Sequence, residues 1–284
     1  MRLATVRIDG HLRAARIDGP APDGTAILLD ASDVGALLAG PDWRARASAA
    51  GGASVATATL DYAPLVPQPD KIICVGLNYR SHILEMGRVV PEFPTVFAKY
   101  RGALIGAHDD IVLPAVSDMV DWEAELTVVI GAPIRHGDRD AAAAAIAGYT
   151  VLNDVSARDW QSRTIQFLQG KTFESSTPVG PWLVTADEPG AAPGPDQRIG
   201  CTVDGEVMQD ASTGDLLFDP VTLVAYLSQV ITLLPGDLIA TGTPGGVGSG
   251  RTPPRFLEDG QEVVTTISGL GVLRNRCRRE VRPH

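Results

Sequence analysis

The sequence is poor in the residues that mark several common protein classes. Its 284 residues include only the cysteines Cys74, Cys201 and Cys277, which are too few and too widely spaced for a disulfide framework or a zinc cluster. No apolar run approaches the roughly 20 residues of a membrane-spanning helix, and the first residues lack the apolar stretch of a secretory signal. We therefore expect a cytoplasmic protein with no membrane partner and with Cys74 buried on an apolar strand.

Basic residues are scarce relative to acidic ones. The chain has 24 lysines and arginines against 34 aspartates and glutamates, which is a net charge of −10. Because an acidic chain repels phosphate backbones, we expect no nucleic-acid partner. Only three residues are lysines, and five of the arginines lie among the last eleven residues, where they predict a solvated basic tail.

Apolar residues, glycine and proline are abundant. Apolar types make up 44% of the chain, which has 30 glycines and 21 prolines. This composition predicts a folded, β-rich mixed α/β protein with many loops. The length suits one large domain with a small appendage. A proline-rich stretch over residues 64–69 separates a predicted small N-terminal domain (residues 1–66) from a predicted catalytic domain (residues 67–284).

Local patterns predict the main elements. In the N-terminal region they predict a hairpin over residues 1–19 and one helix over residues 31–50. Beyond it, strands are expected at residues 71–78, 111–113, 123–130, 149–153, 237–241 and 261–267. Helices are expected at residues 81–87, 138–147 and 219–230. Asp204 and Gly205 suit the tight turn of a hairpin within residues 199–209, and Asp219 precedes Pro220 at a helix start.

Glu123 and Glu125 carry the sharpest local signal. They lie two residues apart on a predicted strand, so their side chains point to the same face. Two adjacent carboxylates repel each other, so either that face is solvated or a cation lies between them. Asp154 follows the next strand and supplies a third carboxylate, unless it only caps the turn after it. Three carboxylates without His or Cys describe a site for Mg²⁺ or Mn²⁺, with Ca²⁺ as the alternative.

His82 and Glu85 form the second signal. Their spacing on a predicted helical turn lets the carboxylate hydrogen-bond the imidazole, and such a pair can activate water. The alternative is an ordinary surface contact.

Cations and glycines supply two further signals. Arg158, Gln161 and Lys171 follow Asp154 closely and are candidates to bind a substrate carboxylate or to polarise a carbonyl. Ordinary surface charge is the alternative. The glycine-rich run at residues 239–248 lets backbone N–H groups approach a ligand, or forms a plain turn.

Taken in order, these segments resemble the fumarylacetoacetate hydrolase family, in the branch of bacterial acylpyruvate hydrolases and 2-hydroxyhepta-2,4-diene-1,7-dioate isomerases. The resemblance covers about residues 70–278. It rests on GLNYxxHxxEMG (76–87), DWEAEL (121–126), GYTxxNDVSARDWQ (148–161), GKTFE (170–174), TPVGPWLV (177–184), LLPGDLIATGTPGGVG (233–248) and ISGLGxLxN (267–275). One departure is Glu174, where many relatives have aspartate.

The resemblance implies a β-roll catalytic domain, a homodimer and a set of site residues. The implied metal ligands are Glu123, Glu125 and Asp154. The implied catalytic residues are His82, Glu85 and Lys171, with His82 and Glu85 on a segment that becomes ordered as a lid in some relatives. The implied substrate contacts are Arg158, Gln161 and Thr243.

The expected substrate is a small oxo acid, and the expected chemistry passes through a Mg²⁺-stabilised enolate. Because both His82 and Glu85 are present, we favour hydrolysis of a C–C bond in an acylpyruvate-type 1,3-diketo acid, in the breakdown of aromatic compounds. The alternatives on the same site are an oxaloacetate-type decarboxylase and a hydroxydienoate isomerase or hydratase. A non-catalytic scaffold stabilised by metal is the alternative of another class.

Overall fold

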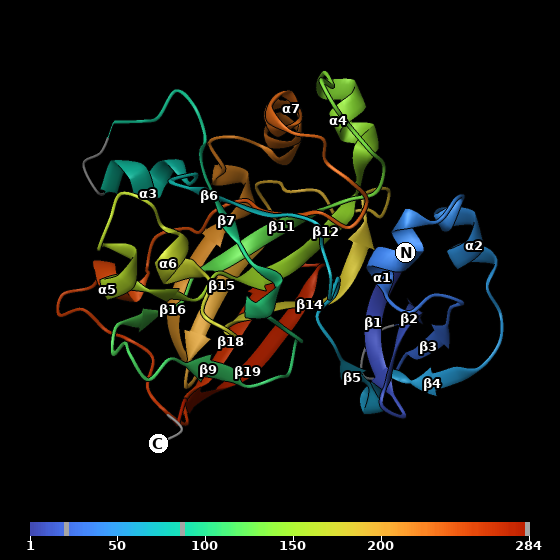
Figure 1. Cartoon of the computed structure of the whole chain (residues 1–284), viewed down its shortest axis with the longest axis horizontal. Coiled ribbons are helices and arrows are strands. Elements are labelled where there is room, and N and C mark those ends of the chain that lie inside the picture. Colours follow the sequence, from blue (N-terminus) through green and yellow to red (C-terminus); the bar gives the residue numbers. More distant parts are fainter. Residues whose placement is uncertain (20–22, 86–88, 282–284) are drawn as a thin grey trace.

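The computed structural model describes residues 1–19, 23–85 and 89–281. Strands dominate, which confirms the predicted β-rich mixed α/β fold (Figure 1). A 12-stranded sheet runs through the molecule, with β5 and β8 attached to β1 and β14. Its strands in spatial order are β4 (Ser54–Ala56), β3 (Thr25–Leu28), β2 (His11–Asp18), β1 (Arg2–Ile8), β14 (Thr177–Thr185), β12 (Ile146–Asn153), β11 (Ala124–Ile130), β17 (Leu238–Ala240), β6 (Ile72–Gly76) and β7 (Thr95–Lys99), with β5 (Asp61–Tyr62) and β8 (Leu104–Ile105) beside this path.

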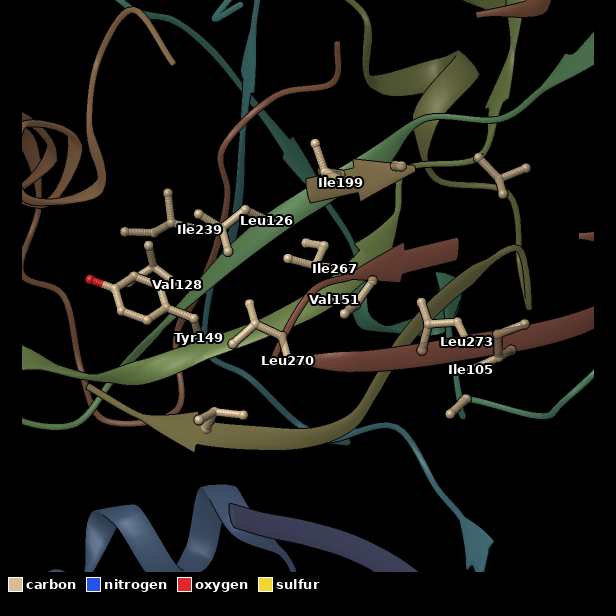
Figure 2. Close-up of a cluster of buried hydrophobic side chains, with 14 of the residues drawn as sticks. Ile105, Leu126, Val128, Tyr149, Val151, Ile199, Ile239, Ile267, Leu270 and Leu273 are labelled. Carbon is tan, nitrogen blue, oxygen red and sulfur yellow. The ribbon is translucent and has the colours of Figure 1, made fainter. Parts of the chain in front are cut away.

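A second, five-stranded sheet packs on one face of the first. Its strands are β16 (Glu206–Ser212), β15 (Arg198–Val203), β18 (Glu262–Ile267), β19 (Gly271–Arg279) and β9 (Ile111–Leu113). A short pair is formed by β10 (Val120–Asp121) and β13 (Ser156–Ala157). Figure 2 shows the apolar core, in which Leu126 and Val128 of β11 lie among side chains that include Ile199 and Ile267 of the second sheet.

Short helices and turns connect and cover the sheets. The helices are α1 (Val34–Ala39), α2 (Trp43–Ala49), α3 (Arg80–Glu85), α4 (Arg139–Ala145), α5 (Arg158–Gln161), α6 (Leu168–Lys171) and α7 (Pro220–Val230). Single 3₁₀ turns are η1 (Thr57–Thr59), η2 (Arg101–Ala103), η3 (Thr213–Asp215) and η4 (Gly248–Gly250). α7 begins as predicted, because the Asp219 carboxylate accepts a hydrogen bond from the Thr222 N–H at 2.8 Å.

The single helix predicted over residues 31–50 is wrong. The chain forms α1 and α2 instead, and Gly40 between them has extended backbone. The residue before a proline is disfavoured in the helical region, and Pro41 follows Gly40. The hairpin turn at Asp204 and Gly205 is confirmed, since both residues have the positive φ values that a two-residue turn requires.

The predicted basic tail is a strand up to Arg279, and Arg282 lies outside the described residues. β19 pairs with β18 and β9, and its burial alternates along the chain. Arg274, Arg276 and Arg278 lie on the exposed face, while Leu273 and Cys277 point into the core. The arginines are therefore solvated, as predicted, but they belong to an ordered sheet. β14, which the local patterns also left unassigned, lies in the middle of the large sheet.

The N-terminal region shares a sheet and a core with the rest of the chain. β1 pairs with β14, and Leu37 of α1 belongs to the same buried cluster as Leu183 and Leu238. Strands from both sides of residue 66 thus belong to one continuous sheet. The predicted domain boundary at this residue stays a prediction.

The three cysteines are buried and free of disulfides. Cys74 is buried on β6, as predicted, and burial raises the pKa of its thiol well above the ordinary value, so the thiol is unreactive. Among the described residues, no helix is long and apolar enough to cross a membrane.

Candidate metal centre and active site

Glu123 immediately precedes β11 and Glu125 is its second residue, and both side chains are almost completely buried. Their exposed fractions are 7% and 1%, so the alternative of a solvated strand face is excluded. Ala124 and Leu126 between and after them point into the core between the two sheets. The period-two alternation therefore places both carboxylates on one face of the strand, as predicted.

Asp154 lies beside the two glutamates because β11 and β12 are antiparallel neighbours. Ala124 pairs with Asn153, and the backbone N–H of Asp154 donates to the Glu123 carbonyl at 2.8 Å. One carboxylate oxygen from each of the residues Glu123, Glu125 and Asp154 lies within 4.8 Å of the others. The predicted acidic triad is thus one cluster.

Buried cations contact this cluster from three directions. Lys171, at the end of α6, has its Nζ 2.6 Å from Glu123 Oε2 and 2.7 Å from Asp154 Oδ2. Lys99, at the end of β7, has its Nζ 2.6 Å from Asp154 Oδ1. Arg158, which opens α5, has its Nη1 2.6 Å from Glu123 Oε1. Because Lys171 is only 2% exposed, ordinary surface charge is excluded for it.

A fourth carboxylate, Asp121, anchors Arg158 and the glycine-rich run. Asp121 accepts a hydrogen bond from Arg158 Nε at 2.8 Å. It also accepts from the backbone N–H groups of Gly248 at 2.7 Å and Ser249 at 2.9 Å. The N–H of Gly242 donates to Glu125 Oε2 at 2.8 Å. The run therefore binds the protein's own carboxylates, and a Cβ at Gly248 would lie 1.9 Å from the Arg255 carbonyl oxygen.

The cluster of Asp121, Glu123, Glu125 and Asp154 with Lys99, Lys171 and Arg158 contains one more carboxylate than cations. Burial raises the pKa of Glu125 well above its ordinary value, and the nearby Asp154 and Glu123 raise it further. Each carboxylate oxygen has two lone pairs, so an oxygen that accepts from a lysine can still bind a metal. When Glu125 is ionised, the all-oxygen set carries one excess negative charge, and it then fits a divalent cation held by Glu123, Glu125 and Asp154.

Glu123 and Glu125 line a cavity of about 330 Å³. Arg158 borders it, and its Nη2 is buried with no hydrogen-bond partner among the described residues. Gln161 and Thr243 also line the cavity, and Gln161 accepts from Arg158 Nη1 at 2.9 Å. An unpartnered guanidinium nitrogen at a cavity wall suits an anionic ligand.

A larger hollow of about 690 Å³ lies elsewhere, beside Arg2, Tyr62 and Trp182. No carboxylate is among its described lining residues. The acidic cluster therefore identifies the smaller cavity as the candidate site.

His82 and Glu85 lie on α3, which confirms a short helix there, from Arg80 instead of Ser81. Residues 86 and 87, where the predicted helix ends, lie outside the described part of the chain. Leu77, three residues before this helix, lines the cavity. The side chains of both residues lie outside the described part of the structure, so their pairing stays a prediction. Glu174, the departure from the family pattern, is exposed.

The sequence patterns missed Lys99 and Asp121 in the cluster, and Gln209, whose Oε1 accepts from the Ala124 N–H at 2.9 Å. Asp121 lies within the motif that carries both glutamates, so its position was a usable signal. Lys99 is one of three lysines in the chain, and two of them contact the same buried aspartate. Gln209 carried no signal, because it reaches the site from the second sheet.

Comparisons with known proteins identify relatives of this chain. Residues 71–278 match the family described as fumarylacetoacetate (FAA) hydrolase C-terminal. A mitochondrial oxaloacetate tautomerase of Rattus norvegicus is 47% identical over 212 residues, which cover 74% of this chain and 67% of that protein. The corresponding human protein is 47% identical over 213 residues, with the same coverage.

Solved structures extend the likeness to nearly the whole chain. A 5-carboxymethyl-2-hydroxymuconate delta-isomerase from Mycobacterium smegmatis has a TM-score of 0.82 and 36% identity, with 99% of this chain and 100% of that chain covered. A 2-hydroxyhepta-2,4-diene-1,7-dioate isomerase from Mycobacterium marinum has a TM-score of 0.82 and 34% identity, with the same coverage. With its acidic cluster, its β-rich fold and these matches, the chain belongs to the fumarylacetoacetate hydrolase family of enzymes.

Proposed function

We propose that this enzyme is a divalent-metal-dependent isomerase that moves a proton within a small 2-oxo acid, as in the keto–enol tautomerisation of oxaloacetate. The observation that carries the proposal is the buried triad of Glu123, Glu125 and Asp154. Two of its members, Glu123 and Glu125, line the cavity together with Arg158, whose buried Nη2 has no partner among the described residues. Relatives named as oxaloacetate tautomerases and hydroxydienoate isomerases support the same reaction class.

The cavity suits a small anion. Arg158 Nη2 offers a charged donor to a substrate carboxylate, and the rest of its guanidinium is held by Asp121 and Glu123. These contacts fix the direction of the free nitrogen, which favours a hydrogen bond to a carboxylate in the plane of the guanidinium. Phe97 and Phe167 pack edge to face, with their ring centroids 5.6 Å apart. Both rings line the cavity and limit the size of the ligand.

The residues divide the chemistry between them. A divalent cation on the three carboxylates would supply Lewis-acid stabilisation of the enolate oxygen. Burial alone would lower the pKa of Lys171, but Asp154 and Glu123 outweigh it and raise that pKa above its ordinary value. Lys171 therefore stays protonated and acts as a cation and hydrogen-bond donor. His82, oriented by Glu85, is the proposed carrier of the proton.

Hydrolysis of an acylpyruvate in the breakdown of aromatic compounds remains the second candidate. It rests on the spacing of His82 and Glu85 on α3, which suits activation of water. Both reactions share the enolate, so the metal ligands do not distinguish them. We favour the isomerase because proton transfer needs only the cation, an anchor for the carboxylate and one proton carrier.

A substrate panel tests the proposal. Enol-oxaloacetate, a hydroxydienoate and an acylpyruvate are each incubated with the protein and Mg²⁺ or Mn²⁺, and the products are identified. We expect metal-dependent ketonisation or double-bond isomerisation, lost in Glu123→Gln and in the presence of a chelator. Acylpyruvate cleavage with no isomerisation would establish the second candidate instead. If wild-type protein binds metal but converts none of the substrates, the alternative of a non-catalytic scaffold stabilised by metal would be favoured.

We also propose a homodimer, Mg²⁺ as the preferred cation and a cytoplasmic location. The resemblance to the family supports the dimer. Sedimentation at micromolar concentration tests it directly, and a fully active species at the monomer mass of 29.9 kDa would contradict it.

A further inference from the structure

The edge of β11 loses its strand partner where the metal ligands begin. β17 pairs with β11 from Val129 to Thr127, and the N–H of Thr241 donates to the Leu126 carbonyl at 2.9 Å. Beyond that point no strand among the described residues pairs with this edge. Ala124, between Glu123 and Glu125, therefore presents an N–H and a carbonyl that need other partners.

Gln209 and Thr243 take the place of the missing strand. Gln209 lies on β16 of the second sheet and is only 2% exposed. Its Oε1 accepts from the Ala124 N–H at 2.9 Å. Its Nε2 donates to Thr243 Oγ1 at 2.8 Å and to the Pro244 carbonyl at 2.9 Å. The Thr243 hydroxyl donates to the Ala124 carbonyl at 2.9 Å.

These contacts close a ring around the residue between the two glutamates. The ring joins the start of β11 to the loop in which the Gly242 N–H holds Glu125 Oε2. Because the Thr243 hydroxyl donates its only proton to the Ala124 carbonyl, Thr243 can only accept a hydrogen bond from a ligand in the cavity. Gln209 itself is not among the residues that line the cavity.

We propose that Gln209 is a positioning residue for the metal centre. By holding Ala124 and Thr243 together, it sets the separation of the Glu123 and Glu125 carboxylates and the placement of the glycine-rich loop. Residues that orient ligands in this way typically change metal affinity about 10–100-fold when they are replaced. The inference rests on the proposed metal-dependent function.

The experiment compares metal affinity in variants that lose a buried amide at different places. Gln209→Met keeps the length and apolar stem of the side chain but removes its three hydrogen bonds, and Gln209→Ala is the second variant. Asn275→Ala is the matched control, since its buried amide holds the carbonyls of Gly106, Ala107 and Asp109 and none of them lines the cavity. Mn²⁺ dissociation constants and metal-free melting temperatures are measured for each protein.

We expect both Gln209 variants to bind Mn²⁺ about 10–100-fold more weakly than wild type. Asn275→Ala should lower the melting temperature and leave Mn²⁺ affinity unchanged. Thr243→Val removes the other half of the ring, so its loss of affinity should not add to that of Gln209→Met in the double variant.

Wild-type Mn²⁺ affinity in Gln209→Met, or full additivity with Thr243→Val, would overturn the role of Gln209 and leave the metal site in place. If wild-type protein itself binds no Mn²⁺, both the proposed metal-dependent function and the role of Gln209 fail. Comparing wild type and Gln209→Met therefore separates the two failures.

Discussion

Lys99 Nζ lies 2.6 Å from Asp154 Oδ1, and both side chains are completely buried. Lys99 ends β7 at the outer edge of the large sheet, whereas Asp154 follows β12 nearer its centre. Lys171 occupies the other oxygen of the same carboxylate. Burial by itself would raise the pKa of Asp154, but Lys171 and Lys99 outweigh it and lower that pKa. Asp154 is therefore held as an anion, the form that binds a metal.

Replacing Lys99 should damage both the fold and the site. Lys99→Met leaves Asp154 with one buried cation fewer, and breaking a buried ion pair typically costs about 3–5 kcal/mol. We expect a clear drop in melting temperature and a fall in activity of about 10–100-fold. Arg198→Met is the control, since its partner Asp210 is exposed and such surface pairs contribute about 0–1 kcal/mol. Equal melting temperatures in the two variants would contradict the prediction.

Replacing Arg158 by lysine should weaken substrate binding. Lysine keeps the charge but loses the planar fork that contacts Asp121, Glu123 and Gln161 and leaves Nη2 free. Since a hydrogen bond to a charged group is worth about 1.5–3 kcal/mol, KM should rise about 10–100-fold. Arg158 also touches Glu123, so a smaller loss of Mn²⁺ affinity is expected. An analogue that lacks the substrate carboxylate should bind wild type and variant alike, and a KM unchanged from wild type would remove the assigned role.

Metal binding should release a proton from Glu125. In the metal-free protein its raised pKa keeps it protonated above the ordinary value of 4.5. A group with a raised folded pKa contributes stability below its unfolded pKa, and this stability is lost as pH rises through the folded pKa. The metal-free protein should therefore lose stability above pH 4.5, by up to about 1.4 kcal/mol per pH unit while this proton is lost.

Added Mg²⁺ should oppose that loss, and metal affinity should increase with pH. Calorimetry of Mn²⁺ binding in buffers of different ionisation enthalpy measures the released proton. Glu125→Gln should flatten the pH dependence of the melting temperature and abolish tight binding. A pH-independent Mn²⁺ affinity with no proton release would show that Glu125 is already ionised.

His82 should act on a proton and leave the metal centre alone. His82→Ala should keep Mn²⁺ affinity near that of wild type while turnover falls about 10²–10⁴-fold, the usual contribution of a positioned acid–base group. Glu85→Ala should give a smaller loss. A metal-dependent decarboxylation of oxaloacetate needs no attacking water, so it should survive His82→Ala better than hydrolysis. Loss of Mn²⁺ binding in His82→Ala would instead make the histidine a ligand.

Deleting residues 1–66 should destabilise the rest of the chain although the deleted part carries none of the acidic cluster. The deletion removes β1 from beside β14 and uncovers buried side chains such as Leu183 and Leu238. We expect low solubility or a much lower melting temperature in the truncated protein. Any soluble fraction should keep its Mn²⁺ affinity. A truncated protein that melts like the full chain would support two independent domains.

Local spacing alone placed Glu123 and Glu125 on one face of a strand, because alternation on a strand depends only on neighbouring residues. The same holds for the turn at Asp204 and Gly205 and for the start of α7 at Asp219, where short-range backbone geometry decides the outcome. The order of the motifs also predicted the family.

Tertiary structure alone decided which of these residues meet. The sequence left open whether Asp154 approaches Glu123, and the antiparallel pairing of β11 with β12 brings them together. Lys99 and Gln209 reach the site from strands 55 and 85 residues away from their partners, a distance that no local pattern spans. Burial is also a property of the whole fold. It strengthens the repulsion between the carboxylates and raises the pKa of Glu125, because low polarity strengthens every charge interaction around them.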